Sequence, residues 1–83
     1  MKVTFHPHAL ARMDERGAAR GEVIETVESG ERLPAKHGRT GFRRNFQCRS
    51  VWRGREFHGK QVEAYAFPEA DGWLVITVVV KYF

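Results

Sequence analysis

Three side chains near the N-terminus, His8, Arg12 and Arg16, follow one another at intervals of four residues. On a helix this spacing places them in one stripe, because residues i and i+4 lie on the same face. Imidazole can transfer a proton near neutral pH, and guanidinium can hold a phosphate or stabilise charge developing on one. The stripe therefore suits metal-independent cleavage of a phosphodiester. The purely structural alternative is that His8 is partly buried and caps the helix or bonds locally, while the arginines pair with Asp14 and Glu15.

A second set of cationic side chains lies in the half of the chain that alternates as strands, among several aromatic rings. Its members are Arg43, Arg44, Arg49, Lys60 and Lys81. Proteins that bind single-stranded RNA combine cationic side chains, which contact the phosphates, with aromatic rings, which stack on the bases. The alternation directs the rings of Phe46, Trp52 and Trp73 towards the core. The cations are therefore stronger candidates for RNA binding than these rings. Tyr82 is a second candidate for acid–base chemistry.

The sequence predicts neither a metal nor another cofactor. The histidines at positions 6, 8, 37 and 58 match no standard zinc spacing, and Cys48 is the only cysteine. The alternation places Cys48 towards the core, which argues against a cysteine nucleophile. No phosphate-binding glycine loop and no Gly-x-Ser-x-Gly elbow is present.

Size and composition indicate one folded domain, residues 1–83, with 42% hydrophobic and 29% charged residues. The formal net charge of +4 favours acidic partners such as nucleic acid or an acidic protein, although a solvated basic surface is the simpler interpretation. No apolar run approaches the roughly 18 residues of a membrane helix, and the N-terminus lacks a signal peptide core. With a single cysteine, these features predict a cytoplasmic protein and no membrane partner.

The N-terminal half predicts a short strand followed by a helical hairpin. Residues 2–5 alternate as a strand, and Pro7 suits the first turn of a helix that continues to Arg16. Gly17 is expected to end this helix in the left-handed conformation. A second helix is predicted over 22–29, with a poor N-terminal cap because Ala19 has no side-chain oxygen.

The C-terminal half predicts an antiparallel meander. The expected segments are an edge strand over 31–37 interrupted by Pro34, a strand over 42–52, a charged loop over 53–59, and strands over 60–67 and 73–83. In the last strand Leu74, Ile76, Val78 and Val80 are predicted on one face, and Trp73, Val75, Thr77 and Val79 on the other. A strand that is apolar on both faces is usually central.

These elements predict an α+β fold in which an N-terminal strand and a two-helix hairpin precede an antiparallel sheet of three to four strands. The helices should cover one face of that sheet. The opposite face is a candidate binding surface, and the residues expected on it are Arg43, Asn45, Gln47, Arg49, Tyr65, Thr77 and Lys81.

Three stretches resemble the bacterial family known as domain of unknown function 4258. They are His8-Ala9-x-x-Arg12-Met13-x-x-Arg16-Gly17, then Glu22-Val23 to Glu28-x-Gly30-Glu31, and Trp73-Leu74-Val75-Ile76-Thr77-Val78. His8, Arg12 and Arg16 match the opening motif of that family, and Thr77 matches the closing one. The chain departs from the family at Ala19, where a polar helix cap is usual.

That family is similar in layout to the RelE/ParE-type toxins, which include ribosome-dependent mRNA interferases paired with an antitoxin. The stripe and the resemblance together motivate the hypothesis of a ribonuclease in which His8 transfers the proton, Arg12 stabilises the phosphorane, and Tyr82 is a second acid–base group. Arg16, Arg43, Arg49, Lys60 and Lys81 would hold the RNA. RNA, the ribosome and a cognate antitoxin are the expected partners. The alternative is a binding module without catalysis that docks nucleic acid or an acidic protein.

Overall fold

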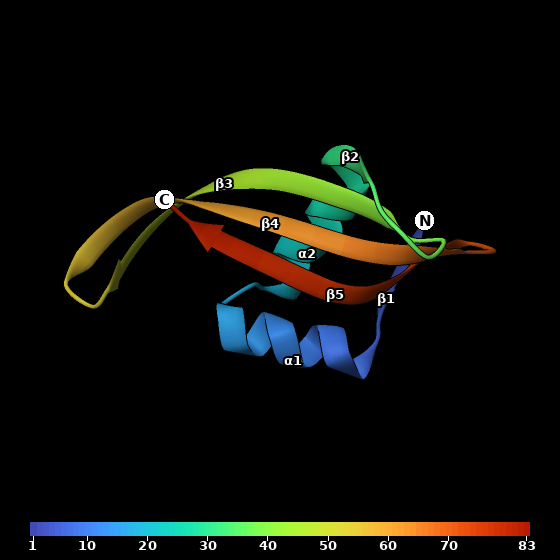
Figure 1. The fold of residues 1–83 in the computed structure, drawn as a ribbon, viewed down its shortest axis with the longest axis horizontal. Helices are drawn as coiled ribbons and strands as arrows, with labels where there is room; N and C mark the ends of the chain where they lie inside the picture. Colours follow the sequence, from blue (N-terminus) through green and yellow to red (C-terminus); the bar gives the residue numbers. More distant parts are fainter.

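The computed structural model describes residues 1–83, with the side chain of Trp52 outside the description. The elements are β1 (Lys2–Phe5), α1 (Pro7–Arg16), α2 (Arg20–Ser29), β2 (Glu31–Pro34), β3 (Thr40–Trp52), β4 (Arg55–Glu69) and β5 (Gly72–Tyr82). They form one five-stranded sheet in the order β1-β5-β4-β3-β2 (Figure 1). None of the described helices has the length and apolar character needed to cross a membrane.

The predicted α+β class is confirmed, but the expected sheet was too small and purely antiparallel. Strand β1 joins it as a parallel neighbour of β5, with Lys2 opposite Gly72 and Phe5 opposite Val75. The helical hairpin makes this possible, because it carries the chain from one edge of the sheet to the other before the meander begins. Strands β2 to β5 then pair antiparallel in sequence order.

Helix α1 begins at Pro7 and is followed by Gly17 in the left-handed conformation, with φ of 80°, as the sequence predicted. The backbone N–H groups of Gly17 and Ala18 both donate to the carbonyl of Met13, at 2.9 Å. At the N-terminus the ring of His6 provides the cap, because its Nδ1 accepts from the backbone N–H of His8 at 3.1 Å. Both ends of the helix that carries the stripe are therefore fixed.

Replacing His6 by alanine should lower the free energy of unfolding by about 0.5–1 kcal/mol, because a free N–H is left at the helix start. Urea denaturation measures this change. His58→Ala is a suitable control, since His58 is exposed and its backbone, not its ring, makes the bonds in the sheet. Equal stability of the His6→Ala protein and the wild type would show that the ring does not act as a cap.

Helix α2 begins at Arg20, two residues before the predicted start. The expected lack of a capping oxygen at Ala19 is confirmed, since no side-chain cap bond forms there. Instead the carboxylate of Glu22 reaches back and accepts from the backbone N–H of Ala19 at 2.9 Å. A glutamate three residues after the cap satisfies one free N–H of the first turn.

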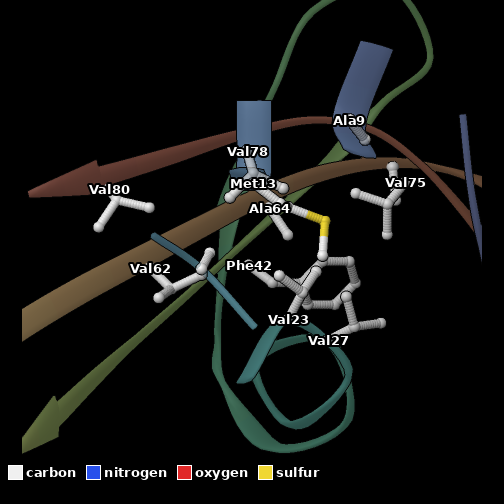
Figure 2. Packing of buried hydrophobic residues seen from close by; sticks show 12 residues of the cluster. Ala9, Met13, Val23, Val27, Phe42, Val62, Ala64, Val75, Val78 and Val80 are labelled. Carbon is white, nitrogen blue, oxygen red and sulfur yellow. The ribbon is translucent and has the colours of Figure 1, made fainter. Parts of the chain in front are cut away.

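The core lies between the two helices and one face of the sheet (Figure 2). Helix α1 contributes Ala9 and Met13, and α2 contributes Val23 and Val27. From the sheet come Phe42, Val62, Ala64, Ala66, Val75, Val78 and Val80. The ring of Trp73 packs edge-on against Phe42, with the ring centroids 5.0 Å apart. Both helices thus cover the same face, as predicted.

The predicted face assignment of β5 was wrong, because a β-bulge interrupts its alternation. Tyr65 pairs with Thr77, whereas Ala66 pairs with Val75, so that Ile76 is an extra residue in β5. Consequently Val75 lies on the core side together with Val78, although strict alternation placed them on opposite faces. An extra residue of this kind shifts the side-chain pattern of a strand from that point onward.

The predicted charged loop over 53–59 was also wrong, because most of it belongs to β4. Arg53 and Gly54 form a two-residue turn with φ of 50° and 73°, the geometry of a tight hairpin. The hairpin extends beyond the rest of the sheet (Figure 1), and we call residues 48–58 the arm. A register shift between Gln47 and Ser50 marks its base. The predicted inward orientation of Trp52 falls on a side chain outside the description.

Candidate functional site

The stripe on α1 lines a groove against the edge of the sheet. Strand β1 pairs with β5 only as far as Val75, and beyond that point α1 runs beside β5 (Figure 1). The groove between them has a volume of about 250 Å³ and is lined by His8, Arg12, Arg16, Thr77, Val78 and Val79. We call it the helix groove. It brings together His8, Arg12 and Arg16, which the sequence singled out, with Thr77 from the far end of the chain.

The structural alternative for the stripe holds for one arginine only. Arg12 pairs with Glu15 at 3.2 Å, and both side chains are well exposed. The imidazole of His8 and the guanidinium of Arg16 form no polar side-chain contact within the described part of the chain. The exposed pair of Arg12 with Glu15 contributes little to stability. The guanidinium of Arg12 can therefore exchange Glu15 for a phosphate at small cost.

The structure separates Tyr82 from His8. The hydroxyl of Tyr82 donates to the backbone carbonyl of Arg16 at 2.7 Å, beside the C-terminus of α1. His8 lies eight residues earlier, which corresponds to about 12 Å along a helix axis. The hydroxyl of Tyr82 is therefore held at the opposite end of α1 from His8, and the structure does not bring the two predicted acid–base groups together.

Lys60 is buried, at 7% exposure, where an exposed RNA contact was expected. Its ammonium donates to the carbonyl of Gly17 at 2.9 Å and to Glu22 at 2.7 Å. Partial burial acts to raise the pKa of Glu22, but the hydrogen bond from Ala19 and the charge of Lys60 outweigh it and lower that pKa below its ordinary value. Lys60 joins both helices to β4, and its ammonium is therefore not free to hold RNA.

The cations predicted on the uncovered sheet face are all paired with carboxylates. The pairs are Arg43 with Glu31 at 2.9 Å, Arg49 with Glu56 at 2.9 Å, and Lys81 with Glu63 at 3.3 Å. Arg44 lies on the helix side and pairs with Glu25 at 3.0 Å. Each cation predicted on this face is therefore matched by a carboxylate, whereas the guanidinium of Arg16 in the helix groove has no ion-pair partner among the described residues.

Sequence reasoning missed Glu63, a nearly buried carboxylate on the face that no helix covers. It accepts from the hydroxyl of Tyr65 at 2.8 Å. This bond, with partial burial and the charge of Glu63, raises the pKa of Tyr65 above its ordinary value. The alternation of 60–67 placed Glu63 and Tyr65 on one face, but it gave no sign that they would bond to each other.

No group of three or more His, Cys, Asp or Glu side chains is placed to hold a metal ion within the described part of the chain. Cys48 is a free thiol of intermediate exposure. The only groups in the helix groove that suit charge or proton chemistry at neutral pH are thus His8, Arg12 and Arg16.

Comparison with protein families gives a match over residues 5–80, to the domain of unknown function DUF4258. The chain belongs to this family. The match includes both the opening and the closing stretches that resemble DUF4258 in the sequence, and the fold brings them to one place, the helix groove. Neither the curated proteins nor the solved structures provide a match to this DUF4258 domain.

Proposed function

We propose that this DUF4258 protein is a toxin-like, metal-independent endoribonuclease that binds RNA in the helix groove. The observation that carries the proposal is the arrangement of one exposed imidazole and two guanidinium groups along a groove at an open sheet edge. Guanidinium groups neutralise the phosphate, and imidazole supplies a proton-transfer group that works near neutral pH.

In this mechanism the imidazole of His8 accepts the proton of the ribose 2′-hydroxyl as the 2′-oxygen attacks phosphorus. The same ring then returns a proton to the departing 5′-oxygen, which leaves a 2′,3′-cyclic phosphate and a 5′-hydroxyl end. Arg12 contacts the non-bridging oxygens of this phosphate and stabilises the charge that builds on them, while Arg16, one turn further along α1, holds the adjoining phosphate of the strand. Proton transfer by one positioned side chain typically contributes 10²–10⁴-fold to a rate.

A growth experiment tests the cellular part of the proposal. Expression of the wild-type chain in a bacterial host should arrest growth, and the His8→Ala/Arg12→Ala double variant should not. Lys36→Ala is a matched control, because Lys36 is an exposed cation outside the groove. Co-expression of the cognate antitoxin that we propose as a partner should relieve the arrest. Normal growth with folded wild-type protein would contradict the toxin proposal.

RNA binding in the helix groove should depend on salt in a way that reflects two arginine–phosphate contacts. For single-stranded nucleic acid the slope of log affinity against log salt is about −0.7 per phosphate. Affinity is then expected to fall about sevenfold between 50 and 200 mM salt, as measured by fluorescence anisotropy with a labelled RNA. A salt-independent affinity would contradict phosphate binding.

A binding module without catalysis is the second candidate, and one observation favours it. Among the residues that line the helix groove, His8 is the single side chain of a type commonly used for proton transfer, and Tyr82 is bonded elsewhere. On this alternative the groove still binds RNA, but no cyclic phosphate product forms. Product analysis after incubation with RNA distinguishes the two functions.

A further inference from the structure

A second, larger groove adjoins the helix groove at Arg16. It has a volume of about 700 Å³ and lies between the C-terminal turn of α1 and the arm, with Val80 and Tyr82 of β5 also lining it. We call it the arm groove. Arg16 lines both grooves, and β5 contributes Thr77 to Val79 to one and Val80 and Tyr82 to the other. The two grooves therefore share Arg16 at the C-terminal end of α1, and we call them together the trough.

The charge changes sign along this trough. The helix groove carries His8, Arg12 and Arg16, whereas the arm groove adds the carboxylates of Asp14 and Glu15. Carboxylates repel a phosphate backbone, but they accept hydrogen bonds from the N–H groups of a nucleobase. The cationic end thus suits the backbone of a strand, and the acidic end suits a base that extends from it.

The arm groove also contains an aromatic pair. The rings of Phe57 and Tyr82 have centroids 6.0 Å apart and are tilted by 58°. Tyr82 is 37% exposed, and its hydroxyl is held by the carbonyl of Arg16, which fixes the ring beside the cationic end. The guanidinium of Arg55 lies over Phe57, 5.1 Å from its centroid. Exposed rings at fixed positions are the usual stacking platforms for unpaired bases.

The two carboxylates of the arm groove differ in their availability. Glu15 is paired with Arg12, whereas Asp14 is exposed and forms no hydrogen bond or ion pair within the described part of the chain. A carboxylate can accept two parallel hydrogen bonds. Guanine is the base that presents two adjacent donors, N1–H and N2–H, on its Watson–Crick edge.

We propose that the arm groove is a nucleobase site that selects an unpaired guanine in RNA, through stacking on Tyr82 and Phe57 and hydrogen bonds to Asp14. This inference rests on the proposed function, because the adjoining phosphate is the one that Arg16 holds. The trough then accepts single-stranded RNA, since a base in a duplex cannot reach Asp14. The site determines specificity and takes no part in proton transfer.

The test measures the binding of labelled eight-residue oligouridylates, 2′-O-methylated to prevent cleavage, with G, A, C or an abasic site at one central position. Wild-type protein should bind the guanine oligonucleotide about tenfold more tightly than the adenine and cytosine ones, which is typical of a good bidentate contact, and should bind the abasic one more weakly still. Asp14→Ala should remove this preference. Glu28→Ala, an exposed acid on α2, is the matched control and should retain it.

A second variant tests the aromatic platform. Phe57→Leu should weaken the binding of the oligonucleotides that carry a base at the central position by roughly tenfold and change the binding of the abasic one much less. If affinity does not depend on the central base but still requires Arg12, the guanine site is overturned and RNA binding in the helix groove stands. No binding of any oligonucleotide would overturn the groove function and the inference together. Guanine preference in a protein that does not cleave RNA would support the inference and contradict the nuclease.

Discussion

Cleavage of RNA by the His8→Ala variant is expected to be at least about 100-fold slower than by the wild-type protein, because the proton-transfer group is lost. The rate is measured with an end-labelled single-stranded RNA in the presence of a metal chelator. The expected effect is confined to activity, since the imidazole of His8 is exposed and bonds to no other side chain that the structure describes.

His58→Ala is the matched control for this experiment. His58 is an exposed histidine on the arm, and its backbone N–H donates to the carbonyl of Phe83, so the ring can be removed without breaking the sheet. Its cleavage rate should equal that of the wild type. A folded His8→Ala protein, with an unchanged melting temperature and full activity, would exclude His8 from the mechanism.

The Lys60→Ala variant is expected to lose about 2–3 kcal/mol of folding free energy. Removing one partner of a buried ion pair costs roughly 3–5 kcal/mol, and we expect less here because Glu22 remains partly solvated. The change also leaves the carbonyl of Gly17 without its donor, at the C-terminus of α1. Urea denaturation measures the loss. Glu22→Gln, which keeps a hydrogen-bonding side chain, should cost less.

The same ion pair predicts how stability depends on pH. The pKa of Glu22 in the folded protein is below its ordinary value of 4.5. The stabilisation from the ionised carboxylate is therefore fully present above about pH 4.5 and is lost as the pH falls through the lower folded pKa. In Lys60→Ala this acid-dependent loss should become smaller. An unchanged stability and pH profile would show that the pair makes no net contribution.

Local signals in the sequence were sufficient for both ends of α1. Pro7 and Gly17 set the two ends of α1, because proline fits a first helical turn and glycine accepts the left-handed conformation. The start of α2 was less clear, since its cap depends on a side chain three residues inside the helix, Glu22. Periodicity marks the body of a helix well and its ends less well.

The sheet was harder to predict, because its departures from regularity depend on pairing between distant residues. Nothing in residues 73–83 alone indicates that Ile76 is an extra residue, since the bulge exists only relative to Tyr65 and Ala66 on β4. Likewise, the parallel pairing of β1 depends on where the helical hairpin returns the chain. The alternation of residues within one strand reveals neither the bulge nor the parallel pairing.

The candidate site shows the same division between local and distant information. The stripe of His8, Arg12 and Arg16 was predicted from the four-residue spacing, because all three residues lie on one helix. The burial of Lys60 and the distance between Tyr82 and His8 depend on how α1 packs against β4 and β5, which the pattern of single segments does not contain. The arm groove was missed for the same reason, since the sequence predicted a loop where the arm extends.

The most direct test of the central claim is to map the RNA contact by two-dimensional NMR, titrating ¹⁵N-labelled protein with a non-cleavable single-stranded RNA. Our account predicts that the amide signals that shift lie in residues 8–17 and 77–82, along the trough formed by α1 and β5. Shifts confined to the uncovered sheet face, in residues 41–47 and 61–65, would contradict it and place the RNA on the paired cations instead.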